Sequence, residues 1–301
     1  MVSDTGTAPA LRRTSEEIAA AFPPLLVAAD RVASTVAQGV HGRRRVGQGE
    51  TFWQYRRFAY GDSPRDIDWR RSARSDRLFV RQTEWEAAQS VWLWPDLTAS
   101  MRYSSHRNLP GKQHRTAILA LALASLLTRG GERIALLDKP ESPATGRAVL
   151  DRIAMTLMHD MDHEPASQDV PPIPDLPRYG TVVLISDFLI EEEILLAFLR
   201  DIAARGVRGH LVQVLDPSEA HLPFRGRTRF RGLETEGELL VGRAESLQGG
   251  YLKRLAALQS ALATFAQRAD WSYAIHTTDA SPEPALMSLF VAMTESPRAG
   301  G

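Results

Sequence analysis

Apolar and polar positions alternate in a regular way from Ser90 to the end of the chain. Short apolar runs predict strands, and longer segments with apolar residues at helical spacing predict helices between them. Together they predict an α/β fold with a doubly wound, mostly parallel sheet covered by helices on both faces. The strands are expected at 91–95, 133–137, 181–185, 210–215 and 272–276, and the helices at 114–128, 147–159, 191–204, 247–268 and 284–294.

Two further patterns lie outside this alternation. Phe230, Leu239 and Val241 surround a Glu-Thr-Glu-Gly turn, which predicts a β-hairpin inserted at about 226–242. Near the start, a helix is expected over 25–38, and an arginine- and aromatic-rich segment ends in an expected strand over 78–86. We therefore expect three parts: an N-terminal helical segment (1–40), a small arginine/aromatic-rich β subdomain (41–88) and a large α/β domain (89–296) that carries the hairpin.

The composition excludes several classes of protein. The chain has 301 residues, 44% of them hydrophobic, which is enough for a substantial core. A formal net charge of +0 gives no overall attraction to nucleic acid or anionic lipid. The lack of cysteine excludes disulfides, thiolate catalysis and cysteine-bound zinc. No signal-like start is seen, and the apolar run 117–127 is too short for a bilayer, so we expect a cytoplasmic protein without a transmembrane segment.

Two acidic residues follow strands that can be neighbours in such a sheet. Asp96 follows 91–95 and Asp187 follows 181–186, and open α/β sheets bind ligands beyond the carboxyl ends of their strands. Thr98 and Ser100 can turn their hydroxyls towards Asp96, and Mg²⁺ prefers oxygen ligands and leaves positions for water or a partner carboxylate. The alternative is that both aspartates only cap loops or helices.

The segment Asp96-Leu97-Thr98-Ala99-Ser100 resembles the metal-ion-dependent adhesion motif, Asp-x-Ser-x-Ser, of von Willebrand factor A domains, with Thr98 in place of a serine. Ser186-Asp187-Phe188 is similar to that family's later aspartate. The resemblance implies a bound Mg²⁺, or else Mn²⁺ or Ca²⁺. It also implies a threonine from an intermediate loop, for which Thr145 is the nearest candidate. The implied ligands are Asp96, Thr98, Ser100, Asp187 and Thr145.

A longer resemblance covers roughly residues 40 to 280. The stretch 56–70, followed by Ser72-Ala73-Arg74, and the later Leu215-Asp216-Pro217-Ser218-Glu219 resemble the signature of the bacterial domain-of-unknown-function family 58. Its members resemble von Willebrand A proteins and are typically encoded beside MoxR-type AAA+ ATPases. The resemblance implies a non-catalytic, metal-dependent protein-binding module that acts as an adaptor or chaperone-like partner of such an ATPase. The signature residues expected to serve a partner or the structure are Arg57, Tyr60, Gly61, Asp62, Arg65, Asp68, Trp69 and Arg74.

Two other functions stay open. The arginine-aromatic segment 43–81 could contact phosphates and stack on bases. Its aspartates can instead pair with the arginines while Ile67 and Trp69 pack on the sheet, so no nucleic acid is expected. A metal-dependent phosphatase would use Asp96 as nucleophile, but the haloacid dehalogenase type needs a second aspartate where this chain has Thr98. His159 and His163 have a spacing that suits zinc on a helix, and we interpret them as a solvated helix end.

Overall fold

The computed structural model describes residues 25–37, 52–57, 67–74, 77–83, 89–163, 169–232 and 237–295. The chain divides into a larger unit, Met1–Gly42 with Gln89–Gly301, and a smaller unit, Arg43–Ala88. The helix over residues 25–37 belongs to the larger unit and buries Leu25, Ala29 and Ala33 in its core. The larger unit therefore covers the apolar face of this helix, which lies within the predicted N-terminal helical segment 1–40.

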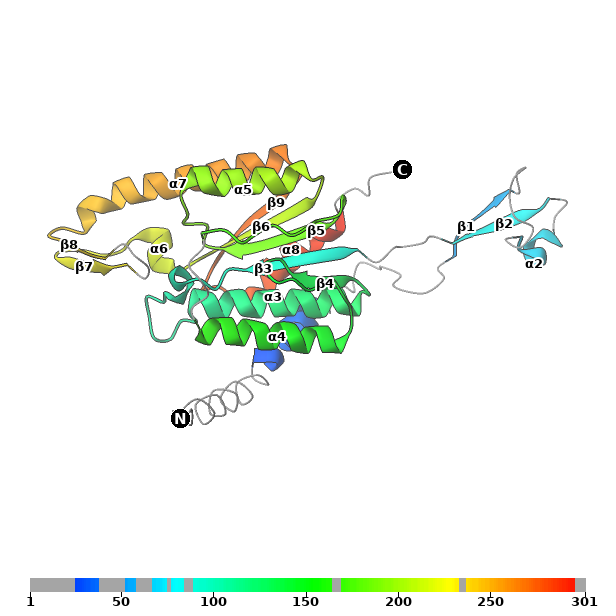
Figure 1. Ribbon diagram of the computed structural model, residues 1–301, viewed down its shortest axis with the longest axis horizontal. Helices are drawn as coiled ribbons and strands as arrows, with labels where there is room; N and C mark the ends of the chain where they lie inside the picture. The colour runs from blue at the N-terminus through cyan, green and yellow to red at the C-terminus, as the bar shows by residue number, and fades with distance from the viewer. Residues whose placement is uncertain are drawn as a thin grey trace, which may run out of the picture. The chain divides into compact units, whose positions relative to one another are not determined.

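A five-stranded parallel sheet forms the centre of the larger unit (Figure 1). Its strand order is β4-β3-β5-β6-β9, and all four pairings are parallel. After β3 the chain adds β4 on one side of the sheet, and after β5 it adds β6 and β9 on the other side. The strand order therefore reverses between the neighbours β3 and β5. The carboxyl ends of β3 and β5 therefore meet where open α/β sheets place their ligands. The strands are β3 (Ser90–Pro95), β4 (Arg133–Leu136), β5 (Thr181–Ser186), β6 (Arg208–Leu215) and β9 (Ser272–Thr277).

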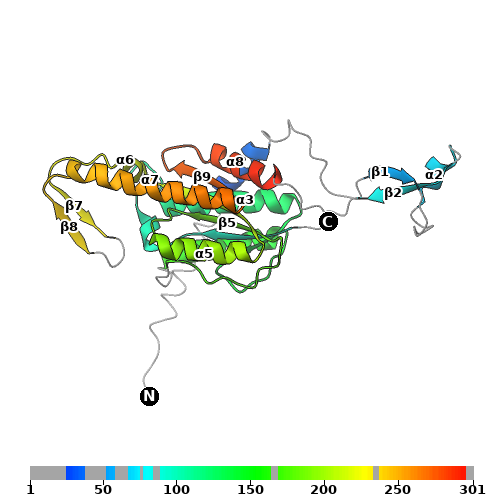
Figure 2. The same cartoon turned by 90° about the horizontal axis from the view of Figure 1, so that it is seen from above.

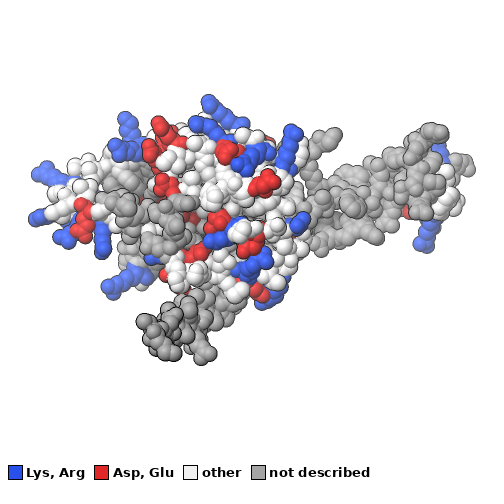
Figure 3. Space-filling view, viewed as in Figure 1, with Lys and Arg blue, Asp and Glu red and all other residues white. Residues whose placement is uncertain are grey.

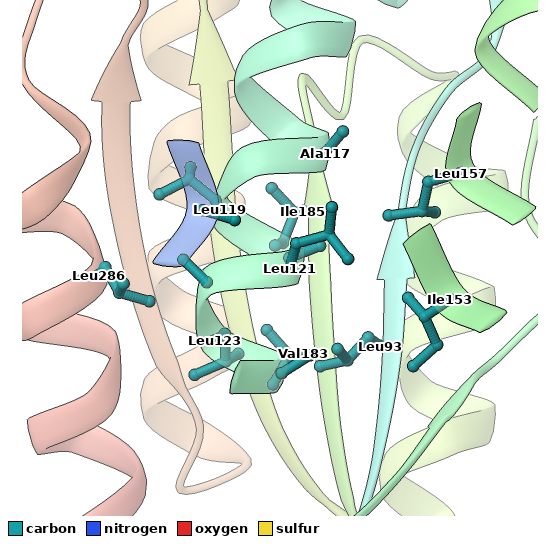
Figure 4. Close-up of a cluster of buried hydrophobic side chains, with 14 of the residues drawn as sticks. Leu93, Ala117, Leu119, Leu121, Leu123, Ile153, Leu157, Val183, Ile185 and Leu286 are labelled. Carbon is teal, nitrogen blue, oxygen red and sulfur yellow. The ribbon is translucent and has the colours of Figure 1, made fainter. Parts of the chain in front are cut away.

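Helices cover both faces of the sheet, as Figure 1 shows, because alternate side chains of each strand point to opposite faces. Leu93, Val183 and Ile185 belong to the core on the face of α3, and Figure 4 shows them with Leu121 of that helix. Trp92 and Leu184 belong to the core on the other face. The first face carries α3 (Lys112–Arg129), α4 (Arg147–Asp162) and α8 (Pro282–Glu295), and the second carries α5 (Glu192–Ala204) and α7 (Glu245–Arg268).

The predicted insertion is present as an antiparallel hairpin, β7 (Thr228–Arg231) with β8 (Glu238–Val241). It follows the short helix α6 (Pro217–His221), and both views show it beyond the end of α7 (Figure 2). Leu239 and Leu240 are 59% and 51% exposed, so the hairpin adds apolar surface outside the core. Within the described part of the chain, no helix is long and apolar enough to span a bilayer.

The smaller unit pairs β1 (Phe52–Arg57) with β2 (Phe79–Thr83) in antiparallel register and adds the single turn α2 (Trp69–Ser72). The Asp68 backbone N–H donates to the Phe79 carbonyl, and the Phe79 N–H donates to the Ser72 hydroxyl, both at 2.9 Å. Ile67 is buried, whereas Trp69 is 63% exposed, so the described residues of the smaller unit do not cover the Trp69 ring. Of the signature residues, Arg57 lies in β1 and Arg74 is exposed, whereas Tyr60, Gly61, Asp62 and Arg65 fall outside the described residues.

Candidate cation-binding site

Asp96 lies directly after β3, at the point where the strand order reverses. Its backbone N–H donates to the Ile185 carbonyl of β5 at 2.8 Å, which fixes the residue beside the end of that strand. Its side chain is buried, with Oδ1 accepting from the Thr98 N–H at 3.0 Å and the Thr98 hydroxyl at 2.7 Å. Oδ2 accepts from the Ser186 hydroxyl at 2.6 Å. All of these donors are neutral, so the described contacts give this buried carboxylate no cationic partner.

The electrostatic setting of Asp96 is therefore unfavourable for its negative charge. Burial raises the pKa of Asp96, and the negative charge of Asp187 raises it further. The hydrogen bonds from Ser186 and Thr98 lower this pKa but do not outweigh the other two effects. A buried carboxylate in this state gains free energy by binding a cation or by taking up a proton.

Thr98 and Ser100 extend the set of oxygens around Asp96. Thr98 is the residue before a short 3-10 helix, η2 (Ala99–Arg102), and the buried side chains of Ala99 and Met101 hold that turn against the core. The Thr98 and Ser100 hydroxyl oxygens lie 3.2 Å apart as a result. The expected grouping of Asp96, Thr98 and Ser100 is thus present in the structure as one continuous group of oxygen atoms.

Asp187 lies after β5 and is also buried, but a lysine already contacts it. Oδ2 of Asp187 is 2.6 Å from Nζ of Lys112, and Oδ1 accepts from the Leu189 N–H at 2.9 Å. Lys112 is the first residue of α3 and is fully buried, and its Nζ is also 2.6 Å from Oε1 of Glu219. Sequence reasoning missed this lysine. The signal was present, because a lysine in the first turn of a helix opposes the helix dipole and needs a reason to be there.

Helix α6 provides Glu219 and is itself tied to the loop after η2. Asp216 caps α6 by accepting a hydrogen bond from the Ser218 N–H at 2.8 Å. The Glu219 carboxylate accepts one from the Asp216 N–H at 2.9 Å. The second oxygen of Asp216 accepts from the Ser105 N–H at 2.9 Å. Burial raises the pKa of Glu219 more than the charge of Lys112 lowers it. For Asp216, burial raises the pKa, but the hydrogen bonds from Ser105 and Ser218 outweigh it and leave the pKa lowered.

Thr145 lies far from this group of side chains. The preceding Ala144 pairs antiparallel with Ile134, which pairs in turn with Val91 near the amino end of β3. Val91 comes five residues before Asp96, and a strand rises about 3.3 Å per residue, so Thr145 lies roughly 16 Å from the Asp96 end of the sheet. Thr145 is also exposed. The prediction of Thr145 as a ligand is corrected, because the chain turns back along β4 before α4 begins.

The described residues contain no group of three or more His, Cys, Asp or Glu side chains that could hold a metal ion. His159 and His163 stack at 4.3 Å between ring centroids at the end of α4, as expected for a helix terminus. A metal at Asp96 would therefore depend on one carboxylate, the hydroxyls of Thr98 and Ser100, and water. Oxygen ligands of this kind fit a hard divalent cation such as Mg²⁺. Asp187 does not fit as a direct ligand, because its Oδ2 already contacts the ammonium group of Lys112, whose positive charge would repel the ion.

Comparison with proteins of known sequence and structure gives one family match and several weakly similar structures. No curated protein matches it. Similar solved structures are BatB from Bacteroides thetaiotaomicron (15% identity, TM-score 0.39) and an aerotolerance-related membrane protein from Bacteroides fragilis (14%, TM-score 0.38). Both matches cover 69% of this chain and 100% of the other, and scores this low add nothing to the fold described above. The profile of the family described as "Protein of unknown function DUF58" matches residues 54–261, more than half of the chain, and the protein therefore belongs to the DUF58 family.

Proposed function

We propose that this protein is a non-catalytic, divalent-metal-dependent protein-binding module of the von Willebrand factor A type, with a doubly wound sheet. Its partner in this proposal is a MoxR-type AAA+ ATPase, for which it acts as an adaptor or chaperone-like subunit. The observation that carries the proposal is the buried Asp96 carboxylate, which meets only neutral donors and lies beside the hydroxyls of Thr98 and Ser100. The choice of ATPase is supported by the resemblance of the signature residues to the family.

The geometry favours binding over catalysis. A divalent cation held at Asp96 would supply one open coordination position to a carboxylate of the partner. The side chains that contact Asp96 are hydroxyls, and no described contact gives it a histidine or lysine that could move a proton during hydrolysis.

Apolar side chains near the same edge of the sheet would add contact area for a partner. Leu189, two residues after Asp187, is 43% exposed, and the hairpin presents Leu239 and Leu240. Exposed arginines lie in and beside the hairpin that carries Leu239 and Leu240, and Figure 3 shows basic side chains at the end of the molecule formed by the hairpin. The arginines are Arg225, Arg227, Arg229, Arg231 and Arg243. A partner with acidic and apolar residues on one face would match this surface.

The experiment that tests the proposal is recovery of partners on the tagged full-length protein, with Mg²⁺ and again with EDTA. Wild type is compared with Asp96→Ala and with Asp169→Ala, an exposed aspartate away from the site that serves as the matched control. We expect an AAA+ ATPase to be retained by wild type and Asp169→Ala in Mg²⁺ and lost in EDTA or with Asp96→Ala. Equal retention in every condition would overturn the metal-dependent part, and no ATPase in any condition would overturn the choice of partner.

One observation favours a second candidate, binding of single-stranded nucleic acid by the smaller unit. Trp69 is 63% exposed, and Arg70 and Arg74 near it are exposed as well. Stacking of a base on such an aromatic ring contributes about 1–3 kcal/mol. Binding of this kind would fall steeply with salt and drop roughly 10-fold or more in Trp69→Ala. Binding to labelled single strands that is absent, or unchanged in Trp69→Ala, removes this candidate.

A further inference from the structure

Lys112 is a buried cation held between two carboxylates from different parts of the chain. Its side chain is fully buried, and its Nζ lies 2.6 Å from Asp187 after β5 and 2.6 Å from Glu219 in α6. The ring of Tyr103 lies on another side, with its centroid 6.0 Å from Nζ. The ammonium group is thus surrounded by groups that favour a positive charge.

Both the helix position and the burial of Lys112 are unfavourable for a lysine. It begins α3, where the helix dipole repels a cation, and burial of an unpaired ammonium group is strongly unfavourable. Burial lowers the pKa of Lys112, but the charges of Asp187 and Glu219 outweigh it and leave the pKa raised. The lysine therefore stays charged, and the two carboxylates are what stabilise it there.

The same contacts change the role of Asp187. The resemblance to the adhesion motif assigns this aspartate to a metal, yet Oδ2 faces the Lys112 ammonium and Oδ1 faces the Leu189 N–H. A metal ion and an ammonium group would compete for the same oxygen and would repel each other at this distance. Glu219, which is not part of that motif, completes the pair of carboxylates that a cation at this position needs.

We propose that Lys112 is a built-in cation that takes the place of a metal ion between Asp187 and Glu219. The Asp187–Glu219 pair then always holds a positive charge that a chelator does not remove. An exchangeable cation can bind only at Asp96, Thr98 and Ser100. The inference concerns the Asp187–Glu219 pair alone and holds whether or not a metal binds at Asp96. It also makes Lys112 a clamp that joins the start of α3 to the end of β5 and to α6, the helix that leads into the hairpin.

The test removes the charge of Lys112 and asks whether a metal ion replaces it. All variants carry Asp96→Asn in the full chain, so that cation binding at Asp96 does not contribute to the result. Lys112→Met leaves two carboxylates facing each other, and we expect its Tm in EDTA to fall by roughly 10 °C. Millimolar Ca²⁺ or Mg²⁺ should recover at least half of that loss, because the ion now binds between Asp187 and Glu219.

Two controls make the outcome specific. Lys139→Met removes a partly exposed lysine that also has two carboxylate partners, Asp138 and Asp160, and it should show a small loss and no response to metal. Lys112→Met combined with Asp187→Asn and Glu219→Gln should regain stability in EDTA and lose the response to metal.

The proposal is overturned if Lys112→Met responds to no divalent cation. It is equally overturned if the neutral triple change responds as strongly as Lys112→Met. Should Lys112→Met fail to fold in EDTA, refolding with and without Ca²⁺ replaces the melting curve. Recovery only with Ca²⁺ supports the proposal, and failure in both, while the neutral triple change folds, overturns it.

Discussion

Replacing Asp96 by asparagine should make the metal-free protein more stable, although it removes the proposed cation ligand. The change keeps the shape of the side chain and removes a negative charge that is buried and repelled by Asp187. Because the pKa of Asp96 is raised above its ordinary value, the folded protein favours the neutral form of this group. The protonated carboxyl group contributes stability at low pH, and that contribution is lost as the pH rises through the raised pKa and the group ionises.

The magnitude follows from the contacts. Burying an ionised carboxylate costs roughly several kcal/mol of folding free energy. Its hydrogen bonds return part of this, since a bond to a charged group contributes about 1 kcal/mol more than a neutral one. In Asp96→Asn, the amide oxygen can still accept from Thr98, but the Ser186 hydroxyl must accept where it donated before. We expect a net gain of about 1 kcal/mol, which raises the Tm by roughly 2–4 °C.

The assay is thermal and urea unfolding in EDTA and again in Mg²⁺. Asp96→Asn should melt above wild type in EDTA, and Mg²⁺ should stabilise wild type but not the variant. Asp216→Asn is the matched control with the opposite sign, because hydrogen bonds lower the pKa of Asp216 and its charge stabilises the fold above its unfolded pKa. If Asp96→Asn is instead less stable than wild type in EDTA by 1 kcal/mol or more, Asp96 is a structural cap and the reasoning fails.

Three further outcomes test the fold and the docking surface. Gly209→Ala should lose about 3 kcal/mol or more in urea unfolding, because its Cβ would lie 2.0 Å from the Trp271 ring, whereas Gly242→Ala, with open space around it, should change little. Burial lowers the pKa of His276 to about 4. As the pH falls from the ordinary pKa of histidine towards that value, this group should lower the stability by roughly 1.4 kcal/mol per pH unit. An equal slope in His276→Gln would contradict this. Leu239→Ser should leave the free energy of unfolding within about 0.5 kcal/mol of wild type but weaken capture of the partner, and unchanged capture would exclude the hairpin from docking.

The central sheet was predictable because its strands are continuous apolar runs. Thr181–Ser186 is buried at every position, and such a strand between two helical segments has few other interpretations. The adjacency of β3 and β5 then brought Asp96 near Asp187 without any knowledge of side-chain contacts. That much of the site follows from local patterns and from the rules of parallel sheets.

The missing parts depend on contacts between residues far apart in the chain. Lys112 meets Asp187 and Glu219 across 75 and 107 residues, and no local pattern encodes those ion pairs. Thr145 was misplaced because the turn after β4 reverses the chain, which the proline and glycine there do not specify. Helix α6 could have been found, since Asp216 and Glu219 have the spacing of a capping box and Pro217 suits a first helical residue.

The smaller unit interrupts the larger one between the helix over 25–37 and β3, two elements that belong to the same core. The larger unit is therefore discontinuous in sequence, and its N-terminal helix can join the core only after a long loop has closed. Replacing Arg43–Ala88 by a short flexible linker would lower the free-energy cost of that closure by roughly 1 kcal/mol on simple loop statistics. A single cut of the chain between the helix over 25–37 and β3 would leave that helix attached to the core by packing alone.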